Sequence, residues 1–163
     1  MISIDNIHKS YGGHVLFDGV SFTLNPREKV GLVGRNGNGK TTLLRILVGE
    51  EDVDSGTITI PRHYRIGHVR QHLSFTEPSV LAECIASLPQ KEADKHWKSE
   101  RILAGLGFGL RDLQQPTEIF SGGYQVRLNL AKVLISEPDL LLLDEPTNYL
   151  DIAAIRWVVK FLQ

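Results

Sequence analysis

The sequence has a single cysteine, Cys84, among its 163 residues, so no disulfide can form within the chain. This usage excludes a small secreted domain held together by disulfides and favours the reducing cytoplasm. The chain also lacks an excess of either charge: 18 Lys and Arg residues stand against 19 Asp and Glu residues, and the formal net charge is -1. Near neutrality gives no electrostatic reason to expect direct binding to DNA or to an anionic membrane surface.

Long hydrophobic runs are absent as well. No run approaches the roughly 18 to 20 apolar residues that cross a bilayer, and the dense stretch at 140–143 has only four leucines. No transmembrane segment is therefore predicted. The sequence shows no internal repeat and no long linker, and its 42% hydrophobic and 23% charged residues are typical of a globular chain. We expect one domain spanning 1–163.

The spacing of apolar residues predicts the order of the secondary structure elements. Alternation predicts strands over 1–8 and 20–24, and short apolar runs predict strands at 29–33, 58–60, 66–69 and 140–143, the last buried on both faces. Helical spacing predicts helices over 41–48, in two parts between 78 and 112, from 122 to about 137, and over 152–162. Strands interleaved with helices, with a helical insert at about 73–137, indicate an α/β fold.

The sharpest local pattern is a glycine-rich loop between a predicted strand and a predicted helix. It matches G-x-x-x-x-G-K-[ST] and comprises Gly34, Arg35, Asn36, Gly37, Asn38, Gly39, Lys40, Thr41 and Thr42. Glycines let successive backbone N–H groups face phosphate oxygens, and the start of the helix adds its positive end. Lys40 would reach the β- and γ-phosphates, and the Thr41 hydroxyl would bind Mg²⁺. A chance glycine-rich turn is the competing explanation, and the strand-loop-helix context argues against it.

Two consecutive carboxylates, Asp144 and Glu145, follow the four leucines of the last predicted strand. In α/β folds with parallel sheets, functional groups gather at the carboxyl ends of strands, where a phosphate loop also lies. Asp144 is therefore a candidate Mg²⁺ ligand, and Glu145 is a candidate for orienting or deprotonating an attacking water. A solvated strand end would explain an isolated Asp-Glu pair equally well, but the phosphate loop favours the catalytic interpretation.

A third segment lies between these two and precedes an amphipathic helix: Ser121, Gly122, Gly123, Tyr124 and Gln125. Exposed amides, the helix dipole and the Ser121 hydroxyl could form an anion site, although a plain helix cap with two glycines would have the same sequence. In this order, the three segments resemble the Walker A, signature and Walker B motifs of ATP-binding cassette (ABC) proteins, and the resemblance covers essentially the whole chain. It implies a P-loop NTPase cassette with N-terminal antiparallel strands, a parallel core sheet and a compact helical subdomain.

The resemblance implies roles for three more residues. Tyr11 resembles the aromatic residue that stacks on adenine, although it could instead be a turn tyrosine packed on the sheet. Gln71 resembles the Q-loop glutamine that binds Mg²⁺ beside the nucleotide, although it could be a surface residue. Asp151 resembles the D-loop aspartate that reaches across a dimer interface. The implied ligands are ATP and Mg²⁺, and the implied partner is a second cassette whose nucleotide the signature segment would cover.

Within the family, the stretch 145–151 resembles the ABC-F subfamily, because Asn148 and Tyr149 stand where transporter cassettes more often have Ser-Ala. ABC-F proteins are cytosolic tandem-cassette ATPases, and many act at the ribosome, which makes the ribosome a possible partner of the full-length protein. The short insert between Gln71 and Ser121 puts a ribosomal role for this segment in doubt. All six histidines precede Glu145, so the switch histidine of a complete cassette is absent. We expect this chain to be the N-terminal part of a longer protein.

Three functions remain open from the sequence. The first is a soluble ABC-F-like ATPase, in which MgATP binding joins two cassettes and Glu145-assisted hydrolysis releases them. The second is the ATP-binding subunit of a membrane transporter. The third is a module that binds ATP without catalysis. A GTPase is disfavoured because no Asn-Lys-x-Asp segment for guanine recognition occurs. Because each composite site needs two cassettes, we expect the isolated chain to bind ATP but to hydrolyse it inefficiently.

Overall fold

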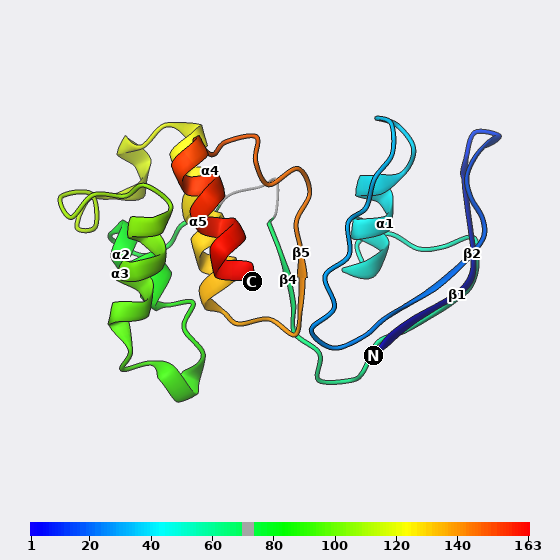
Figure 1. The fold of residues 1–163 in the computed structure, drawn as a ribbon, viewed down its shortest axis with the longest axis horizontal. Coiled ribbons are helices and arrows are strands. Elements are labelled where there is room, and N and C mark those ends of the chain that lie inside the picture. The colour runs from blue at the N-terminus through cyan, green and yellow to red at the C-terminus, as the bar shows by residue number, and fades with distance from the viewer. Residues whose placement is uncertain (70–73) are drawn as a thin grey trace. The chain divides into compact units, whose positions relative to one another are not determined.

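A computed structural model describes residues 1–69 and 74–163, and the chain divides into two compact units, Met1–Ile66 and Gly67–Gln163. Across both units, strands and helices are interspersed as expected for an α/β fold, with antiparallel strands at the N-terminus (Figure 1). In the described part of the chain, no helix is both long and apolar enough to traverse a membrane.

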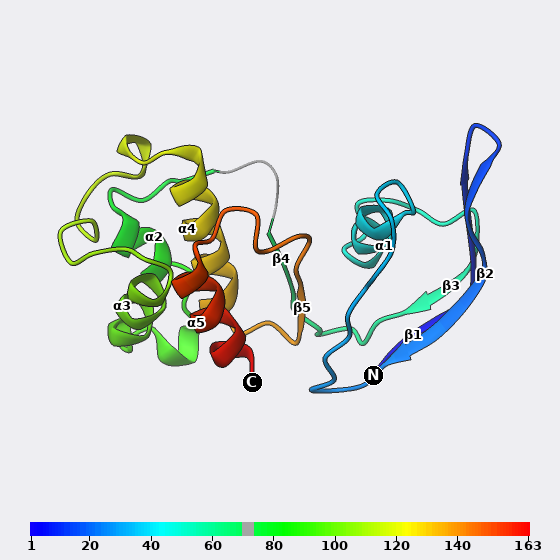
Figure 2. The same cartoon turned by 45° about the horizontal axis from the view of Figure 1, so that its top comes forward.

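The first unit contains a three-stranded antiparallel sheet and one helix (Figure 2). Strand β1 (Ile2–Tyr11) lies between β2 (His14–Leu24) and β3 (Ser55–Thr59), and helix α1 is Lys40–Leu47. Alternation buries one side of β1, and α1 buries apolar residues at helical spacing. The buried apolar residues of this unit are Ile2, Ile4, Ile7, Phe17, Leu43, Leu44, Ile46 and Leu47.

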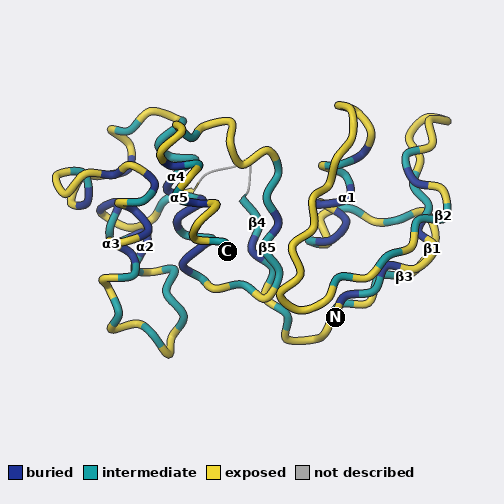
Figure 3. The backbone as a smooth tube through the Cα atoms, in the orientation of Figure 1, coloured by how far each residue is buried: buried dark blue, intermediate teal, exposed yellow. Residues whose placement is uncertain are grey.

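One predicted strand of the first unit is wrong. The residues at 29–33 form no strand, and every residue from 25 to 38 is exposed, including Val33 at 94% (Figure 3). A strand needs ladder hydrogen bonds to a neighbour as well as an apolar sequence. Among the described strands, none pairs with this stretch. The apolar run at 29–33 therefore forms part of an extended, exposed connection between β2 and α1.

The second unit is mainly helical. Helices α2 (Val80–Ile85), α3 (His96–Gly105), α4 (Gly122–Ile135) and α5 (Ile152–Leu162) surround one apolar core. Short 3-10 helices lie at Gln90–Glu92 and Thr117–Ile119. The core contains Val80, Cys84, Ile102, Leu103, Leu106, Phe108, Leu113, Leu128, Leu130, Ala131, Leu134, Ile135 and Val158. Helix α5 has the predicted bounds, α4 lies close to its predicted range, and α2 and α3 lie within the stretch 78–112 where two helical parts are predicted.

Two short strands, β4 (Ile66–His68) and β5 (Leu140–Leu142), pair with each other. The sequence predicts that the leucine run is buried on both faces, and this is wrong in degree: Leu142 is buried, whereas Leu140 and Leu141 are half-buried. Burial of both faces requires packed layers on each side of the sheet, and the cover over Leu140 and Leu141 is incomplete. Strand β5 nevertheless delivers the chain to Asp144 and Glu145.

A missing side chain lets α3 and α5 approach each other. A Cβ atom on Gly105, at the end of α3, would lie 2.0 Å from Cε2 of Trp157 on α5. The Trp157 ring also stacks on Phe161, with centroids 5.0 Å apart. The indole therefore occupies the space that any larger residue at 105 would need. Alanine at this position would overpack the core at a typical cost of about 1–3 kcal/mol.

A buried carboxylate ties α2 to α4. The Glu83 side chain is 1% exposed, and its Oε2 lies 2.5 Å from Nζ of Lys132. Its Oε1 accepts hydrogen bonds from the backbone N–H groups of Thr76 and Glu77. Burial alone would raise the pKa of Glu83, but the hydrogen bonds from Lys132, Glu77 and Thr76 outweigh burial and lower it. The buried charge is therefore paired and hydrogen-bonded, as such groups must be.

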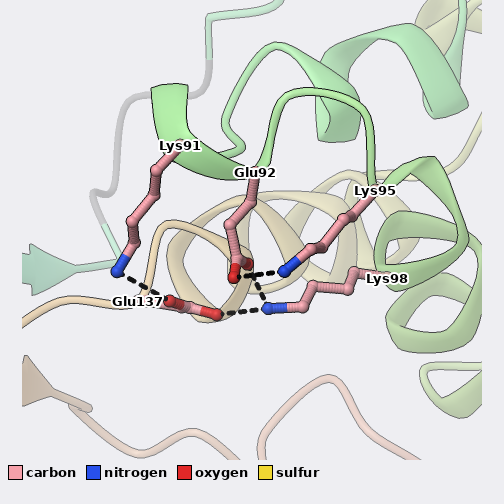
Figure 4. Close-up of polar contacts among 5 residues, drawn as sticks. All are labelled: Lys91, Glu92, Lys95, Lys98 and Glu137. Atoms are coloured by element: carbon pink, nitrogen blue, oxygen red, sulfur yellow. Dashed lines mark hydrogen bonds and ion pairs between the residues drawn. The ribbon is translucent and has the colours of Figure 1, made fainter.

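A network of half-buried and exposed charges holds α3 to the end of α4 (Figure 4). Glu92 contacts Lys95 and Lys98, and Lys98 also lies 2.7 Å from Glu137. Lys91 completes the network at 4.0 Å from Glu137. Hydrogen bonds from Lys98 and Lys95 lower the pKa of Glu92 to about 2. This network joins residues far apart in the sequence at the carboxyl end of α4.

Candidate functional site

The glycine-rich segment 34–42, hereafter the phosphate loop, runs into the first residue of α1, as predicted. Its residues 34–38 are exposed and Gly39 is buried. Gly37 and Gly39 adopt φ angles of 85° and 84°, which side chains other than glycine rarely tolerate. A Cβ atom on Gly39 would also lie 3.0 Å from Cζ of Phe17 on β2. The contact with β2 therefore fixes where the loop ends and the helix starts.

Lys40 lies across the phosphate loop. Its Nζ donates hydrogen bonds to the backbone oxygens of Gly34 at 2.8 Å and Arg35 at 3.0 Å. An ammonium has three N–H donors, so these two bonds place the charge over the loop with one donor left by this count. Thr41 lies in the first turn of α1 and is exposed. The phosphate contact of Lys40 and the Mg²⁺ contact of Thr41 stay predictions.

Tyr11 is the last residue of β1, and its ring is 46% exposed. Nζ of Lys9 lies 5.0 Å from the ring centroid, within cation–π range. Lys9 is itself held by Asp52 O at 2.7 Å and by Glu51 at 3.2 Å. The ring is thus accessible for stacking and is placed by an anchored cation. Its contact with adenine stays a prediction.

Asp144 and Glu145 follow β5 in the second unit, as predicted. Asp144 is half-buried and Glu145 is exposed. Glu145 has φ 45°, a conformation that costs a non-glycine residue about 1–2 kcal/mol. Its Oε2 accepts a hydrogen bond from Nδ2 of Asn148 at 2.7 Å. Asn148 therefore orients the candidate catalytic carboxylate, a contact that the sequence motif did not reveal.

The signature turn, residues 121–123, opens α4. Ser121 is the N-cap residue, and both Ser121 and Gly122 are exposed. Within the described structure the Ser121 hydroxyl makes no capping hydrogen bond, so it does not satisfy the amides of its own helix. Tyr124 and Gln125 follow inside α4: Tyr124 packs edge-on against Phe108 at 5.3 Å, and Gln125 Nε2 donates to Phe120 O at 3.2 Å. These two residues anchor the first turn of α4 to Phe108 and Phe120.

Two further residues stand in or beside the signature helix. Asp151 is the N-cap of α5, and its Oδ1 accepts a hydrogen bond from Ala154 N at 2.9 Å. That bond and the bond from Arg127 lower the pKa of the Asp151 carboxyl. Arg127, six residues after Ser121, has no role predicted from the sequence. Its spacing of three from Tyr124 was the available signal, because residues three apart in a helix share a face.

Thr41 in the first unit and Asp144 in the second each carry oxygen donors of the kind that Mg²⁺ prefers. Among the described residues, no group of three or more His, Cys, Asp or Glu side chains forms a metal cage. Mg²⁺ in nucleotide sites is usually held by one or two protein oxygens together with substrate phosphates and water, so it does not need such a cage. Gln71, the third predicted ligand, lies outside the described residues.

Comparisons with known proteins identify the family and the fold of the chain. A family model described as ABC transporter matches residues 17–148. The probable ATP-binding protein YheS of Escherichia coli K12 is 37% identical over all of this chain and 30% of its own length. Human ATP-binding cassette sub-family F member 3 is 38% identical over 99% of this chain and 27% of its own length. The chain thus spans less than a third of each of these relatives.

A solved structure shares the fold. It is the dimeric post-hydrolysis state of the ATP-binding cassette MJ0796 bound to ADP and Pi. It aligns with a TM-score of 0.78 and 22% identity, over 99% of this chain and 81% of its own. The family model covers most of the chain and includes the phosphate loop, the signature turn and the Asp144–Glu145 pair. The chain belongs to the ABC transporter family, as an ATPase cassette similar to ABC-F proteins.

Proposed function

We propose that this chain binds MgATP, associates with a second cassette in an ATP-dependent way and hydrolyses ATP as a conformational switch. Family membership supports ATP binding, and the dimeric state of a solved cassette of the same fold supports the association. We further propose that the two units are parts of one nucleotide-binding domain. The observation that carries the proposal is the exposed signature turn at the start of α4.

Triphosphate binding would fall to the phosphate loop, with the adenine ring against Tyr11. Backbone N–H groups of residues 34–42 and the amino end of α1 favour an anion. Lys40 already spans the loop through Gly34 and Arg35, so its ammonium needs only a small rearrangement to meet phosphate oxygens. Thr41, Asp144 and Gln71 would hold the magnesium ion. When bound, that ion neutralises charge that develops on the phosphate oxygens.

The signature turn would serve the nucleotide of the partner cassette. Gly122 has open space where a Cβ atom would lie, and Gly123 approaches only Cδ1 of Tyr149, at 3.8 Å. The turn therefore offers backbone amides and the Ser121 hydroxyl to an approaching γ-phosphate without obstruction. A turn with this role has to be accessible from outside its own unit, and Ser121 and Gly122 are exposed.

Hydrolysis would use Glu145 as the base that receives a proton from water. The water oxygen forms a bond to the γ-phosphorus, the bond from that phosphorus to the β–γ bridging oxygen breaks, and the electron pair leaves with ADP. The 2.7 Å hydrogen bond from Asn148 to Glu145 would hold one carboxylate oxygen and leave the other for the water. Cleavage would remove the γ-phosphate that joins the two cassettes, so they would separate.

We propose an ABC-F-like role in the cytoplasm over that of a transporter subunit. Relatives at 37–38% identity include a member of sub-family F, and the Asn148–Tyr149 pair lies inside the hydrogen-bonded turn after β5. A second cassette is the partner that the composite site requires. A ribosomal role would belong to the full-length protein.

Sedimentation equilibrium of the Glu145→Gln variant, which should bind but not hydrolyse ATP, tests the proposal. We expect a monomer without nucleotide and a dimer with MgATP. Ser121→Glu places a carboxylate where the partner's γ-phosphate would bind, so it should abolish the dimer. Gln114→Glu adds the same charge at another exposed site of the unit and should leave the dimer intact. A Glu145→Gln chain that stays monomeric at saturating MgATP contradicts the proposal.

A further inference from the structure

Arg127 on α4 joins three separate segments of the second unit. Its Nε donates to Tyr149 O at 2.7 Å, and its Nη1 lies 3.2 Å from Leu106 O and 3.1 Å from Oδ2 of Asp151. The guanidinium carbon lies 4.8 Å from the centre of the Tyr124 ring. The side chain is only 12% exposed. One residue of the signature helix therefore binds the end of α3 and the chain that follows Glu145.

The Asp151 carboxylate that Arg127 contacts is held through both of its oxygens. Asp151 Oδ2 accepts a hydrogen bond from Arg127, and Oδ1 accepts one from the backbone N–H of Ala154, so both carboxylate oxygens have a partner. Because the second bond caps α5, the carboxylate has a defined direction at the start of that helix. Tyr149 is held through its backbone oxygen rather than its side chain. Arg127 thus sets the path of the backbone as well as one side chain.

Consecutive hydrogen-bonded turns connect Tyr149 back to Glu145. Asn148 N donates to Glu145 O at 3.1 Å, and Leu150 N donates to Thr147 O at 3.1 Å. The Asn148 side chain also holds the Glu145 carboxylate. Residues 145–151, hereafter the post-β5 segment, are therefore a continuously hydrogen-bonded stretch. Arg127 contacts two of its last three residues, Tyr149 and Asp151.

We propose that Arg127 is a positioning residue that holds the post-β5 segment in a fixed place relative to the signature turn. This inference rests on the proposed function and adds a coupling within one cassette. Ser121 stands six residues before Arg127 on the same helix, about 9 Å along its axis. A partner's nucleotide that seats on the signature turn would therefore meet Asp151 in one defined place and would leave Glu145 correctly directed.

The geometry requires arginine rather than any cation. A guanidinium presents donors in a rigid planar fork and can also stack on an aromatic ring, whereas an ammonium is a single point of charge on a flexible stem. Lysine at 127 could reach Tyr149 or Asp151, but it could not reproduce the contacts with both and with Leu106. A purely structural tie between helices would tolerate this change better than a positioning role would.

The test compares Arg127→Lys, Arg127→Met and Asp151→Asn, each in the Glu145→Gln chain, by ATP-dependent dimerisation and by ATP affinity of the monomer. The expected result is a dimer dissociation constant about 10- to 100-fold larger for Arg127→Met. Arg127→Lys should restore little of this loss. ATP affinity of the monomer should not change, because the phosphate loop belongs to the other unit. Arg101→Met, which removes an exposed arginine of α3, is the matched control.

The double variant separates positioning from stability. If Arg127 acts through Asp151, Arg127→Met combined with Asp151→Asn should weaken the dimer no more than the worse single change. In the otherwise unchanged chain, Arg127→Met should lower kcat for ATP hydrolysis and leave KM nearly constant. Unchanged dimerisation of Arg127→Met overturns the inference. It is also overturned if the losses of dimer affinity in the two single variants add up in the double variant and parallel a fall in the thermal unfolding midpoint of each variant. A Glu145→Gln chain that never dimerises overturns the proposed function, and the inference with it.

Discussion

The phosphate loop and the signature turn are both glycine-containing entries to a helix, yet they are built differently. The phosphate loop begins within a stretch of fourteen consecutive exposed residues, 25–38, and its internal order comes from Lys40 and the contact of Gly39 with Phe17. The signature turn opens a helix whose sides are held by an aromatic cluster, a buried ion pair and Arg127. The comparison teaches that the phosphate loop is held mainly by contacts of its own residues, whereas the signature turn begins a helix that is packed and ion-paired along its sides.

The largest expected effect is on the stability of the second unit, at the buried ion pair of Glu83 and Lys132. Glu83→Gln removes the charge that Lys132 faces, and we expect the free energy of unfolding of the second unit to fall by about 3 kcal/mol. Both tryptophans, Trp97 and Trp157, lie in this unit, so tryptophan fluorescence during urea unfolding reports on it alone. Glu118→Gln, at an exposed glutamate, is the control. A loss no larger than that of the control would show that the pair does not stabilise the signature helix.

The second largest effect should lie at Gly39. Gly39→Ala combines an unfavourable φ with a clash against Phe17, so we expect a loss of about 2–3 kcal/mol from the first unit. Gly37→Ala has a similar φ but open space around it, and should cost about 1 kcal/mol. Hydrogen exchange of β1 and α1 measures both changes. Equal losses for the two variants would mean that contact with β2 does not position the loop.

The third effect is on binding rather than on folding. Lys40→Met removes the cation that spans the loop, and we expect ATP affinity to fall about 10- to 100-fold. The free energy of unfolding should change by less than about 1 kcal/mol, because the side chain is only half-buried. Calorimetric titration with ATP measures the affinity. Arg45→Met, an exposed arginine of α1, controls for the lost charge, and an affinity loss of the same size there would refute the specific role.

The smallest effect concerns acid. The pKa of Glu92 is lowered to about 2 by Lys98 and Lys95, so the network in Figure 4 contributes stability above pH 4.5. This contribution should be lost as the pH falls from 4.5 towards 2, when Glu92 becomes protonated in the folded state as well. Lys98→Met should therefore lower stability at pH 7 but make little difference near pH 2. Tryptophan fluorescence during urea unfolding at the two pH values provides the measurement, and an equal loss at both would contradict it.

The sequence predicted the motifs better than their supports. The bounds of α5 and the start of α4 follow from apolar periodicity and from Ser121, because a helix packed on one side shows its period directly. The strand expected at 29–33 failed, since an apolar run does not reveal whether another strand pairs with it. The link from Asn148 to Glu145 depends on a local turn that the motif does not specify, and the link from Arg127 to Asp151 depends on the tertiary fold. The same holds for the contact between Glu83 and Lys132, which are 49 positions apart.

The close approach of Gly105 and Trp157 constrains how this family of sequences can change. Because the indole fills the volume of the absent Cβ, a side chain gained at 105 must be matched by a smaller residue at 157. The two positions should therefore covary among relatives, with glycine opposite tryptophan and larger residues opposite leucine or valine. A single step at either position would separate α3 from α5, so evolutionary paths between the two packings should pass through weakened intermediates.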